Sequence, residues 1–173
     1  YDDSRFEGNI LEGNGTLIGI IDSGIDITNR DFIDENGNTR IAAAWAQTGS
    51  DGVPPVGFAK GREYTREDID QAIKENSRTD LYDSLGHGTA VAGIAAGNGN
   101  GSGFRGVAPK AELLIVKLDE NNVYSRSTDI MRGLKYIKDK AEQLGKPVAI
   151  NISYGTNEGA HDGTSLFEGY IDE

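Results

Sequence analysis

The sequence predicts an α/β protein of three layers, in which a mainly parallel β-sheet lies between helices. Three apolar, β-branched segments are bounded by glycine and polar residues, as buried strands are: residues 16–22, 112–118 and 148–153. Between the last two, residues 127–144 place apolar side chains at helical spacing. This order predicts the α/β class, because two near-continuously apolar strands joined by a helix form the repeating unit of covered parallel sheets.

The remaining elements fit a single domain of this class. Residues 87–97 (HGTAVAGIAAG) are rich in alanine and glycine, which predicts a helix that packs closely on its neighbours. Residues 66–76 predict a short amphipathic helix with Thr65 as its N-cap. Around that helix, residues 34–81 hold turn signals and one candidate strand at 40–45. We interpret residues 34–81 as an insertion into the domain.

Composition and charge exclude several classes of partner. The 28 acidic and 17 basic side chains among 173 residues give a formal charge of −11, which repels nucleic acids and anionic membranes. No apolar run approaches the roughly 18 residues that span a bilayer. The chain has no cysteine, which excludes disulfides and thiolate metal sites. We therefore expect a globular protein with neither a nucleic-acid nor a membrane partner.

Three short segments carry the residue types of a catalytic site. Asp22 follows the first predicted strand, and ligand sites of α/β sheets lie at the carboxyl ends of strands. His87 begins a predicted helix and is flanked by glycines. Ser153, Tyr154 and Gly155 follow the last predicted strand at the same edge. Each segment alone is typical of a turn, a cap or a structural histidine, so a functional prediction depends on their combination.

In combination, the segments resemble the subtilisin-like serine protease (subtilase) family. The family's aspartate motif, histidine motif, following turn and substrate-binding strand are matched in order by 22–26 (DSGID), 87–93 (HGTAVAG), 106–109 (GVAP) and 151–155 (NISYG). The insertion and the YGTNEGAHDGTS stretch resemble the clostridial germination-protease branch of that family. The resemblance implies a subtilisin-like α/β/α fold and a serine endopeptidase that works through an acyl-enzyme.

The resemblance also implies roles for the matched residues. His87 would act as general base and then general acid, while Asp22 holds its imidazole in one tautomer. Residues 153–155 would pair with an extended peptide substrate, and Tyr154 would form part of the pocket wall. The nucleophilic serine and the oxyanion asparagine would follow residue 173. We therefore expect residues 1–173 to be the N-terminal part of a secreted or extracytoplasmic catalytic domain, inactive without the serine-bearing remainder.

The neighbours of the catalytic pair give a weaker indication of the substrate. Relatives that cleave at dibasic sites place acidic residues beside the aspartate and histidine, whereas this chain has Ser23 and Leu85 there. That difference argues against a dibasic preference. Asp83 still leaves room for a nearby basic side chain.

Two other functions remain open at this stage. A pseudoprotease would keep the fold and act as a binding or scaffold protein, and a GTSxA motif after residue 173 would decide against it. Residues 101–106 (GSGFRG) spell a dinucleotide fingerprint. That fingerprint needs a strand before it and a helix after it, the reverse of the order predicted here, so we expect no organic cofactor.

Ser165 is a decoy for the nucleophile. Residues 163–165 (GTS) resemble the start of the family's serine motif, but Ser165 follows Ser153 by too few residues for that role. Ser165 and Glu168 instead have the spacing of a capping box, in which each side chain satisfies a backbone donor of the other. We predict that Ser165 caps a helix.

A calcium site is the last implication of the resemblance. The family binds calcium in the loop that follows the histidine helix, where mixed carboxylate, amide and carbonyl oxygens suit the ion. The corresponding ligands are the side chains of Asp31 and Asn100 and the backbone carbonyls of Asn98, Ser102 and Phe104. The alternative is a plain glycine-rich turn.

Overall fold

The computed structural model describes residues 11–49, 51–119, 126–155 and 162–172. In this part of the chain, a five-stranded sheet has the order β3-β2-β4-β1-β5. The strands are β1 (Leu17–Asp22), β2 (Ile41–Ala46), β3 (Arg62–Thr65), β4 (Glu112–Lys117) and β5 (Val148–Ile152). All neighbouring strands are parallel except β3, which pairs antiparallel with β2. The helices are α1 (Arg66–Glu75), α2 (His87–Ala96), α3 (Arg126–Leu144) and α4 (Leu166–Asp172), with a short 3₁₀ turn at Arg30–Phe32.

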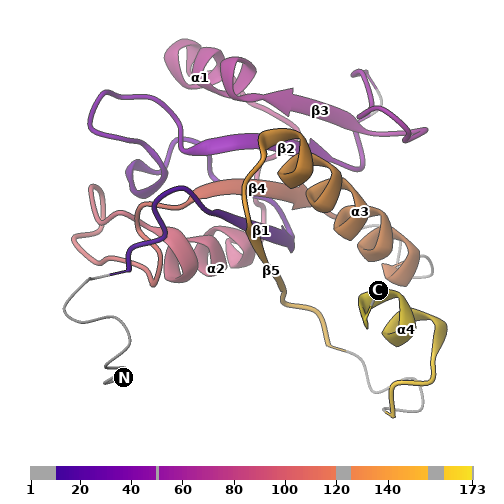
Figure 1. The fold of residues 1–173 in the computed structure, drawn as a ribbon. Coiled ribbons are helices and arrows are strands. Elements are labelled where there is room, and N and C mark those ends of the chain that lie inside the picture. Colours follow the sequence, from indigo (N-terminus) through magenta and orange to yellow (C-terminus); the bar gives the residue numbers. More distant parts are fainter. Residues whose placement is uncertain (1–10, 50, 120–125, 156–161, 173) are drawn as a thin grey trace, which may run out of the picture.

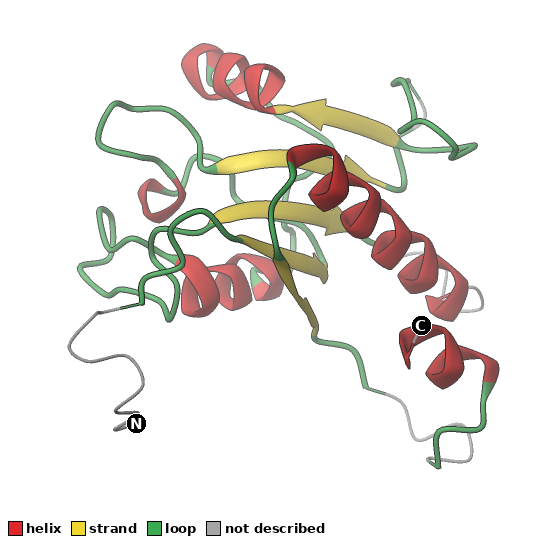
Figure 2. Ribbon diagram, viewed as in Figure 1, coloured by secondary structure: helices red, strands yellow, loops and turns green. Residues whose placement is uncertain are grey.

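Helices cover both faces of the sheet, so the predicted three-layer α/β/α class is confirmed (Figures 1 and 2). Alternation along the central strands produces two cores. Ile20 of β1 and Ile115 of β4 belong to the core that includes Ala92 of α2. Ile21 and the neighbouring β4 side chains belong to the core under Ile137 of α3. Each central strand is therefore apolar on both faces, which explains the unbroken apolar runs in the sequence.

Gly19 shows why α3 can lie so close to the sheet. A Cβ atom at this position would come within 2.9 Å of two side-chain carbons of Ile137. Since real Cβ atoms do not approach other atoms that closely, only glycine lets Ile137 fill the space over the middle of β1.

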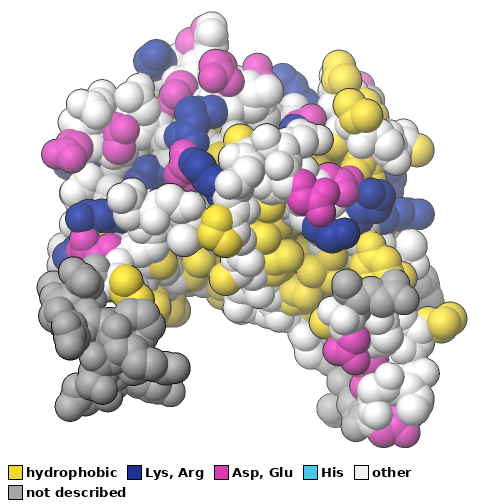
Figure 3. All heavy atoms as spheres, viewed as in Figure 1, with side chains coloured by type: hydrophobic (Ala, Val, Ile, Leu, Met, Phe, Trp, Pro, Cys, Tyr) yellow, Lys and Arg dark blue, Asp and Glu magenta, His cyan; other side chains and the backbone are white. Residues whose placement is uncertain are grey.

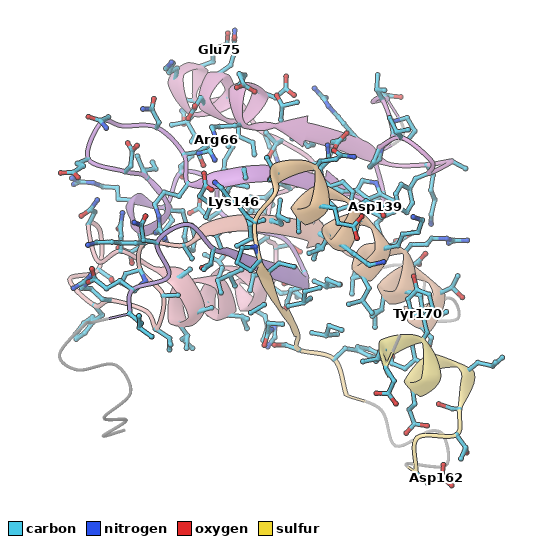
Figure 4. The ribbon with its side chains drawn as sticks, viewed as in Figure 1. Arg66, Glu75, Asp139, Lys146, Asp162 and Tyr170 are labelled. Carbon is cyan, nitrogen blue, oxygen red and sulfur yellow. The ribbon has the colours of Figure 1, made fainter. Side chains whose placement is uncertain are left out.

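The two ends of the sheet differ in chemistry. At the amino end of β4, Glu112 forms ion pairs with both Arg66 and Lys146, and the two basic residues lie near one another in Figure 4. At the β5 edge, Ala149 and Ile150 are exposed, and apolar side chains gather on the face along which β5 runs (Figure 3). Ion pairs of Glu112 thus connect the amino end of β4 to Arg66 and Lys146. The β5 edge, by contrast, has no strand partner on its outer side in the described part of the chain.

The segment interpreted as an insertion, residues 34–81, contains β2, β3 and α1. The candidate strand at 40–45 corresponds to β2, which lies inside the sheet between β3 and β4. The sequence analysis missed β3 because its residues (REYT) are mostly polar and it occupies an edge. The helix at 66–76 begins, as predicted, at a Thr65 cap that forms a capping box with Asp68.

Ser165 immediately precedes α4. Its hydroxyl contacts the carboxylate of Glu168 at 2.6 Å, and the Glu168 N–H donates back to the Ser165 Oγ at 3.2 Å. This capping box confirms the prediction that Ser165 caps a helix. Tyr170 joins α4 to α3 by donating its hydroxyl hydrogen to the carbonyl of Met131 at 3.2 Å.

Candidate active site

Asp22 and His87 meet at the carboxyl edge of the sheet. Asp22 is the last residue of β1, and His87 is the first residue of α2. Their side chains lie 2.8 Å apart, from Asp22 Oδ1 to His87 Nδ1, although 65 positions separate them in the chain. The Asp22 side chain is buried, with 5 % exposed, while 55 % of the His87 side chain is exposed. A buried carboxylate thus holds an imidazole that faces solvent.

Two glycines make this meeting sterically feasible. A Cβ atom at Gly88 would collide with the carbonyl oxygen of Gly24 and would lie 3.1 Å from the Cβ of Asp22. Gly24 itself has a φ of +129°, a conformation that side-chain-bearing residues rarely adopt. The first turn of α2 therefore rests directly on the backbone that follows β1, which brings His87 within hydrogen-bond distance of Asp22.

The contact with Asp22 determines the protonation chemistry of His87. An ionised carboxylate only accepts hydrogen bonds, so the imidazole carries its hydrogen on Nδ1 and leaves Nε2 as the basic nitrogen. The hydrogen bond to Asp22 raises the pKa of His87 above its usual value, and the negative charges of Asp22 and Asp83 act in the same direction. His87 is thus an exposed base whose conjugate acid is stabilised by a buried carboxylate, the arrangement used for general-base catalysis.

Asp22 has unequal oxygens. Its Oδ1 accepts from His87 and from the N–H of Ser23, which lies 2.7 Å away. Its Oδ2 is buried and has no hydrogen-bond partner within the described ranges. An ionised oxygen without a donor in a buried place is costly, so the negative charge of Asp22 is compensated mainly on the side that faces His87.

The predicted substrate segment lies at the same edge of the sheet. Residues 153–155 follow β5, the parallel neighbour of β1, and all three are exposed. Because β5 is an edge strand in the described part, its outer backbone groups face no other strand there. This geometry suits an extended peptide added beside the strand end.

Asp83 cannot serve as a recognition group for a basic substrate in the way the sequence suggested. It is buried, with 8 % exposed, and its two oxygens accept hydrogen bonds from Ser23, Gly86 and Thr89. These internal bonds join Asp83 to residues as far away as Ser23, 60 positions along the chain, and could not be predicted from the sequence around Asp83. The signal available was an acidic residue four positions before a helix whose N-cap position, Gly86, has no side chain to accept the first N–H groups.

The predicted calcium ligands lie around one loop beside the end of α2. The buried Asp31 Oδ1 accepts the N–H groups of Gly101 and Ser102 at 2.7 and 3.0 Å, which places the carboxylate against the loop. Burial would raise the pKa of Asp31, but hydrogen bonds from Ser102 and Gly101 and the charge of Arg40 hold it below its usual value. The loop is therefore in contact with a carboxylate that stays ionised near neutral pH.

The amides of this loop have partners inside the protein. Asn98 and Asn100 both donate from Nδ2 to the carbonyl of Ile33, at 2.7 and 3.1 Å. The Asn98 Oδ1 accepts the N–H of Asn100, which leaves the backbone carbonyl of Asn98 as its predicted ligand atom. The exposed Phe104 accepts the hydroxyl of Ser102 through its carbonyl at 3.2 Å. Asp31 is the one carboxylate of the predicted set, and no group of three or more acidic or histidine side chains suited to a metal occurs among the described residues.

A buried aspartate that contacts an exposed histidine at the carboxyl edge of an α/β sheet is an arrangement from which serine hydrolases build a general base. The sequence profile described as "Subtilase family" matches residues 13–173. The chain belongs to the subtilase family of serine proteases.

Solved and curated proteins agree with this assignment. The chain is similar to the CspB protease of Clostridium perfringens, with a TM-score of 0.82 and 36 % identity over 99 % of this chain and 36 % of that one. It is 31 % identical to the PII-type proteinase of Lactococcus lactis subsp. cremoris over 157 residues, which are 86 % of this chain and 8 % of the relative. It is also 37 % identical to a subtilisin of Bacillus sp. (strain TA39) over 101 residues, 58 % of this chain and 21 % of that protein. The expected resemblance to the clostridial branch is thereby confirmed, and the chain spans about a third of the CspB chain.

None of the helices in the described part of the chain is both long and apolar enough to cross a membrane.

Proposed function

We propose that the protein containing this chain is a serine endopeptidase in which His87 is the general base and Asp22 its orienting carboxylate. The observation that supports the proposal is the 2.8 Å contact between Asp22 Oδ1 and His87 Nδ1, which engages Nδ1 rather than Nε2 of an imidazole whose side chain is 55 % exposed. The nucleophile would be a serine from the rest of the protein, since Ser165 is engaged as a helix cap. His87 would accept the proton of that serine and return it to the leaving amine.

The substrate would be a protein or peptide that binds in extended form at residues 153–155. The support is their exposure beside β5, at the edge of the sheet that also carries Asp22. Backbone hydrogen bonds would give affinity there, and Tyr154, which is 39 % exposed, would contact a side chain of the peptide.

The experiment is a comparison of His87→Ala with His161→Ala in the full-length protein, because the chain has two histidines. His87→Ala should lower kcat by about 10⁴-fold or more, as loss of a triad member does, while His161→Ala should leave kcat within about twofold of the parent. Activity within about tenfold of the parent in His87→Ala would refute the assignment of the base. A parent that hydrolyses no peptide and takes up no serine-directed phosphonate would instead be a pseudoprotease.

We also propose that the loop at 98–104 binds a structural calcium ion. The donor set fits the ion, because it combines the ionised Asp31 with the Asn100 amide and backbone carbonyls. When bound, calcium would supply positive charge that links the loop to the segment around Asp31. The ion takes no part in the proposed reaction.

A further inference from the structure

The first turn of α2 depends on a carboxylate outside the catalytic pair. The N-cap position of α2 is Gly86, which has no side chain to accept the free N–H groups of the helix start. Asp83 supplies the missing acceptor, because its Oδ2 receives the N–H and the hydroxyl of Thr89 at 2.8 and 2.7 Å. Its Oδ1 receives the N–H of Gly86 at 2.9 Å. Asp83 therefore fixes the turn that carries His87.

The same carboxylate reaches the end of β1 through Ser23. The Ser23 Oγ lies 2.8 Å from Asp83 Oδ1 and 3.1 Å from Asp22 Oδ1, and it accepts the N–H of Gly88 at 3.0 Å. A hydroxyl has one hydrogen, so Ser23 donates to one carboxylate at a time. The shorter distance favours Asp83. Ser23 thus lies between two buried carboxylates and holds the helix that carries the base.

The charge of Asp83 persists near neutral pH. Burial alone would raise the pKa of Asp83, but hydrogen bonds from Thr89, Ser23 and Gly86 outweigh it and hold that pKa below its usual value. The charged side chains that act on His87 within the described residues are Asp22 on β1 and Asp83 before α2. Lys117 is the β4 partner of Asp22, and its Nζ donates to the carbonyl of Tyr82.

We propose that Asp83 and Ser23 are positioning residues of the catalytic pair. Asp83 holds the turn that carries His87, and through the hydroxyl of Ser23 it also holds the strand end that carries Asp22. The two segments are thereby locked together by one buried carboxylate. This inference rests on the proposed function, yet it concerns groups that do not touch the substrate.

The kinetic test uses Ser23→Ala and Ser23→Thr in the full-length protein. Ser23→Ala removes the bridge but keeps the Ser23 backbone N–H on Asp22, so kcat should fall by about 10- to 100-fold while KM changes little. Ser23→Thr keeps the hydroxyl and should restore most of the loss. Rates are expressed per active site titrated with a phosphonate, which separates misplacement from misfolding. A Ser23→Ala enzyme with parental kcat per active site overturns the proposal.

The second test measures the pKa of His87 by NMR titration of the full-length protein, in which the His87 signal is assigned by its absence in His87→Gln. The pKa of His87 should fall in Asp83→Asn, because a negative charge and an anchor of the helix are lost. Asp26→Asn is the matched control: it removes the same charge from the turn after β1, where the Asp26 carboxylate contacts only Thr28 in the described structure. An Asp83→Asn protein whose His87 titrates as in Asp26→Asn overturns the proposal.

The two readouts also separate this inference from the proposed function. If the parent lacks peptidase activity, the proposed function fails, while the NMR titration still reports whether Asp83 controls His87. Should Asp83→Asn not fold, Thr89→Val replaces it, because it removes the Thr89 hydroxyl from Asp83 and keeps the backbone N–H bond. Thr89→Val should lower kcat per active site, and a parental value would contradict the role of Asp83.

Discussion

The two ends of α2 are both held by buried charge, but the charges differ in sign and in kind. At the start, the carboxylate of Asp83 accepts the N–H groups of Gly86 and Thr89. At the end, the guanidinium of Arg40, which is 8 % exposed as a residue, donates to the carbonyls of Asp31 at 3.0 Å and Ala96 at 2.7 Å. Each charge complements the helix dipole at its end.

The difference lies in what each charge can do. Asp83 is titratable and contacts side chains that lead to Asp22, so the start of α2 is coupled to the reactive groups. Arg40 stays protonated, as arginine does in proteins, and the hydrogen bonds of its guanidinium within the described residues go to backbone carbonyls, including that of Ala111 before β4. The C-terminal end of α2 is thus held to three chain segments by a charge that does not titrate. The N-terminal end is held by the carboxylate of Asp83, whose bonds depend on its ionisation and on the hydroxyl groups of Ser23 and Thr89.

Removing the guanidinium of Arg40 should have the largest effect on stability of the changes considered for the two ends of α2. Arg40→Met removes the guanidinium donor from three backbone carbonyls, those of Asp31, Ala96 and Ala111. The Asp31 carbonyl also accepts the N–H of Asn98. We expect the free energy of unfolding to fall by about 3 kcal/mol or more. Urea denaturation measures the loss. The control is Arg105→Met, which removes the exposed Arg105 from its ion pair with Glu12 and should lower the free energy of unfolding far less. Equal losses in the two variants would show that Arg40 is not an attachment point.

Calcium should act only at the far end of the helix. If the loop at 98–104 binds the ion, the folded state should gain about 2.7 kcal/mol at a hundredfold excess over the dissociation constant. Chelation should then lower the melting temperature, and Asp31→Asn should weaken the response. Asp34→Asn, whose carboxylate caps the neighbouring turn at Asn36 and Asn38, should respond to calcium as the parent does. A melting curve that ignores both calcium and chelator would identify the loop as a glycine-rich turn.

The smallest expected effect is a difference in amide protection between the two ends of α2 at acidic pH. The folded-state pKa of Asp83 is lowered, so its stabilisation is complete above the unfolded value of about 3.9 and is lost as pH falls through the folded pKa. Arg40 keeps its charge over that range. Amide exchange measured between about pH 5 and pH 3 should therefore show the N–H of Thr89 losing protection before that of Gly97, which bonds to Gly93. If the N–H of Gly97 lost protection before that of Thr89, the C-terminal end of α2 would be the acid-labile end, contrary to the prediction.

Local patterns account for what could be predicted from the sequence. The central strands could be found because both of their faces are buried, and the Ser165 cap because its partner Glu168 is three residues away. The roles of Asp22 and His87 came from motifs rather than from geometry, and they stay predictions until the variants are measured. The 2.8 Å contact between these two side chains shows only that the fold brings them together.

Long-range polar contacts account for the rest. The bond between Ser23 and Asp83 joins residues 60 positions apart, and nothing in either local sequence specifies it. Arg40 precedes β2, and its residue type alone predicts an exposed position, since arginine is seldom fully buried. Its burial depends on carbonyls from three segments that only the folded chain assembles.

The close contact between Gly88 and Gly24 sets the distance between the start of α2 and the chain segment that follows β1. Because main chain rests on main chain there, no rotamer change can alter the spacing between α2 and the end of β1. The hydrogen bond between Asp22 and His87 therefore depends on the placement of α2 against β1 as well as on the rotamers of the two side chains. The position of α2 against the end of β1 therefore determines where the imidazole of His87 lies relative to Asp22.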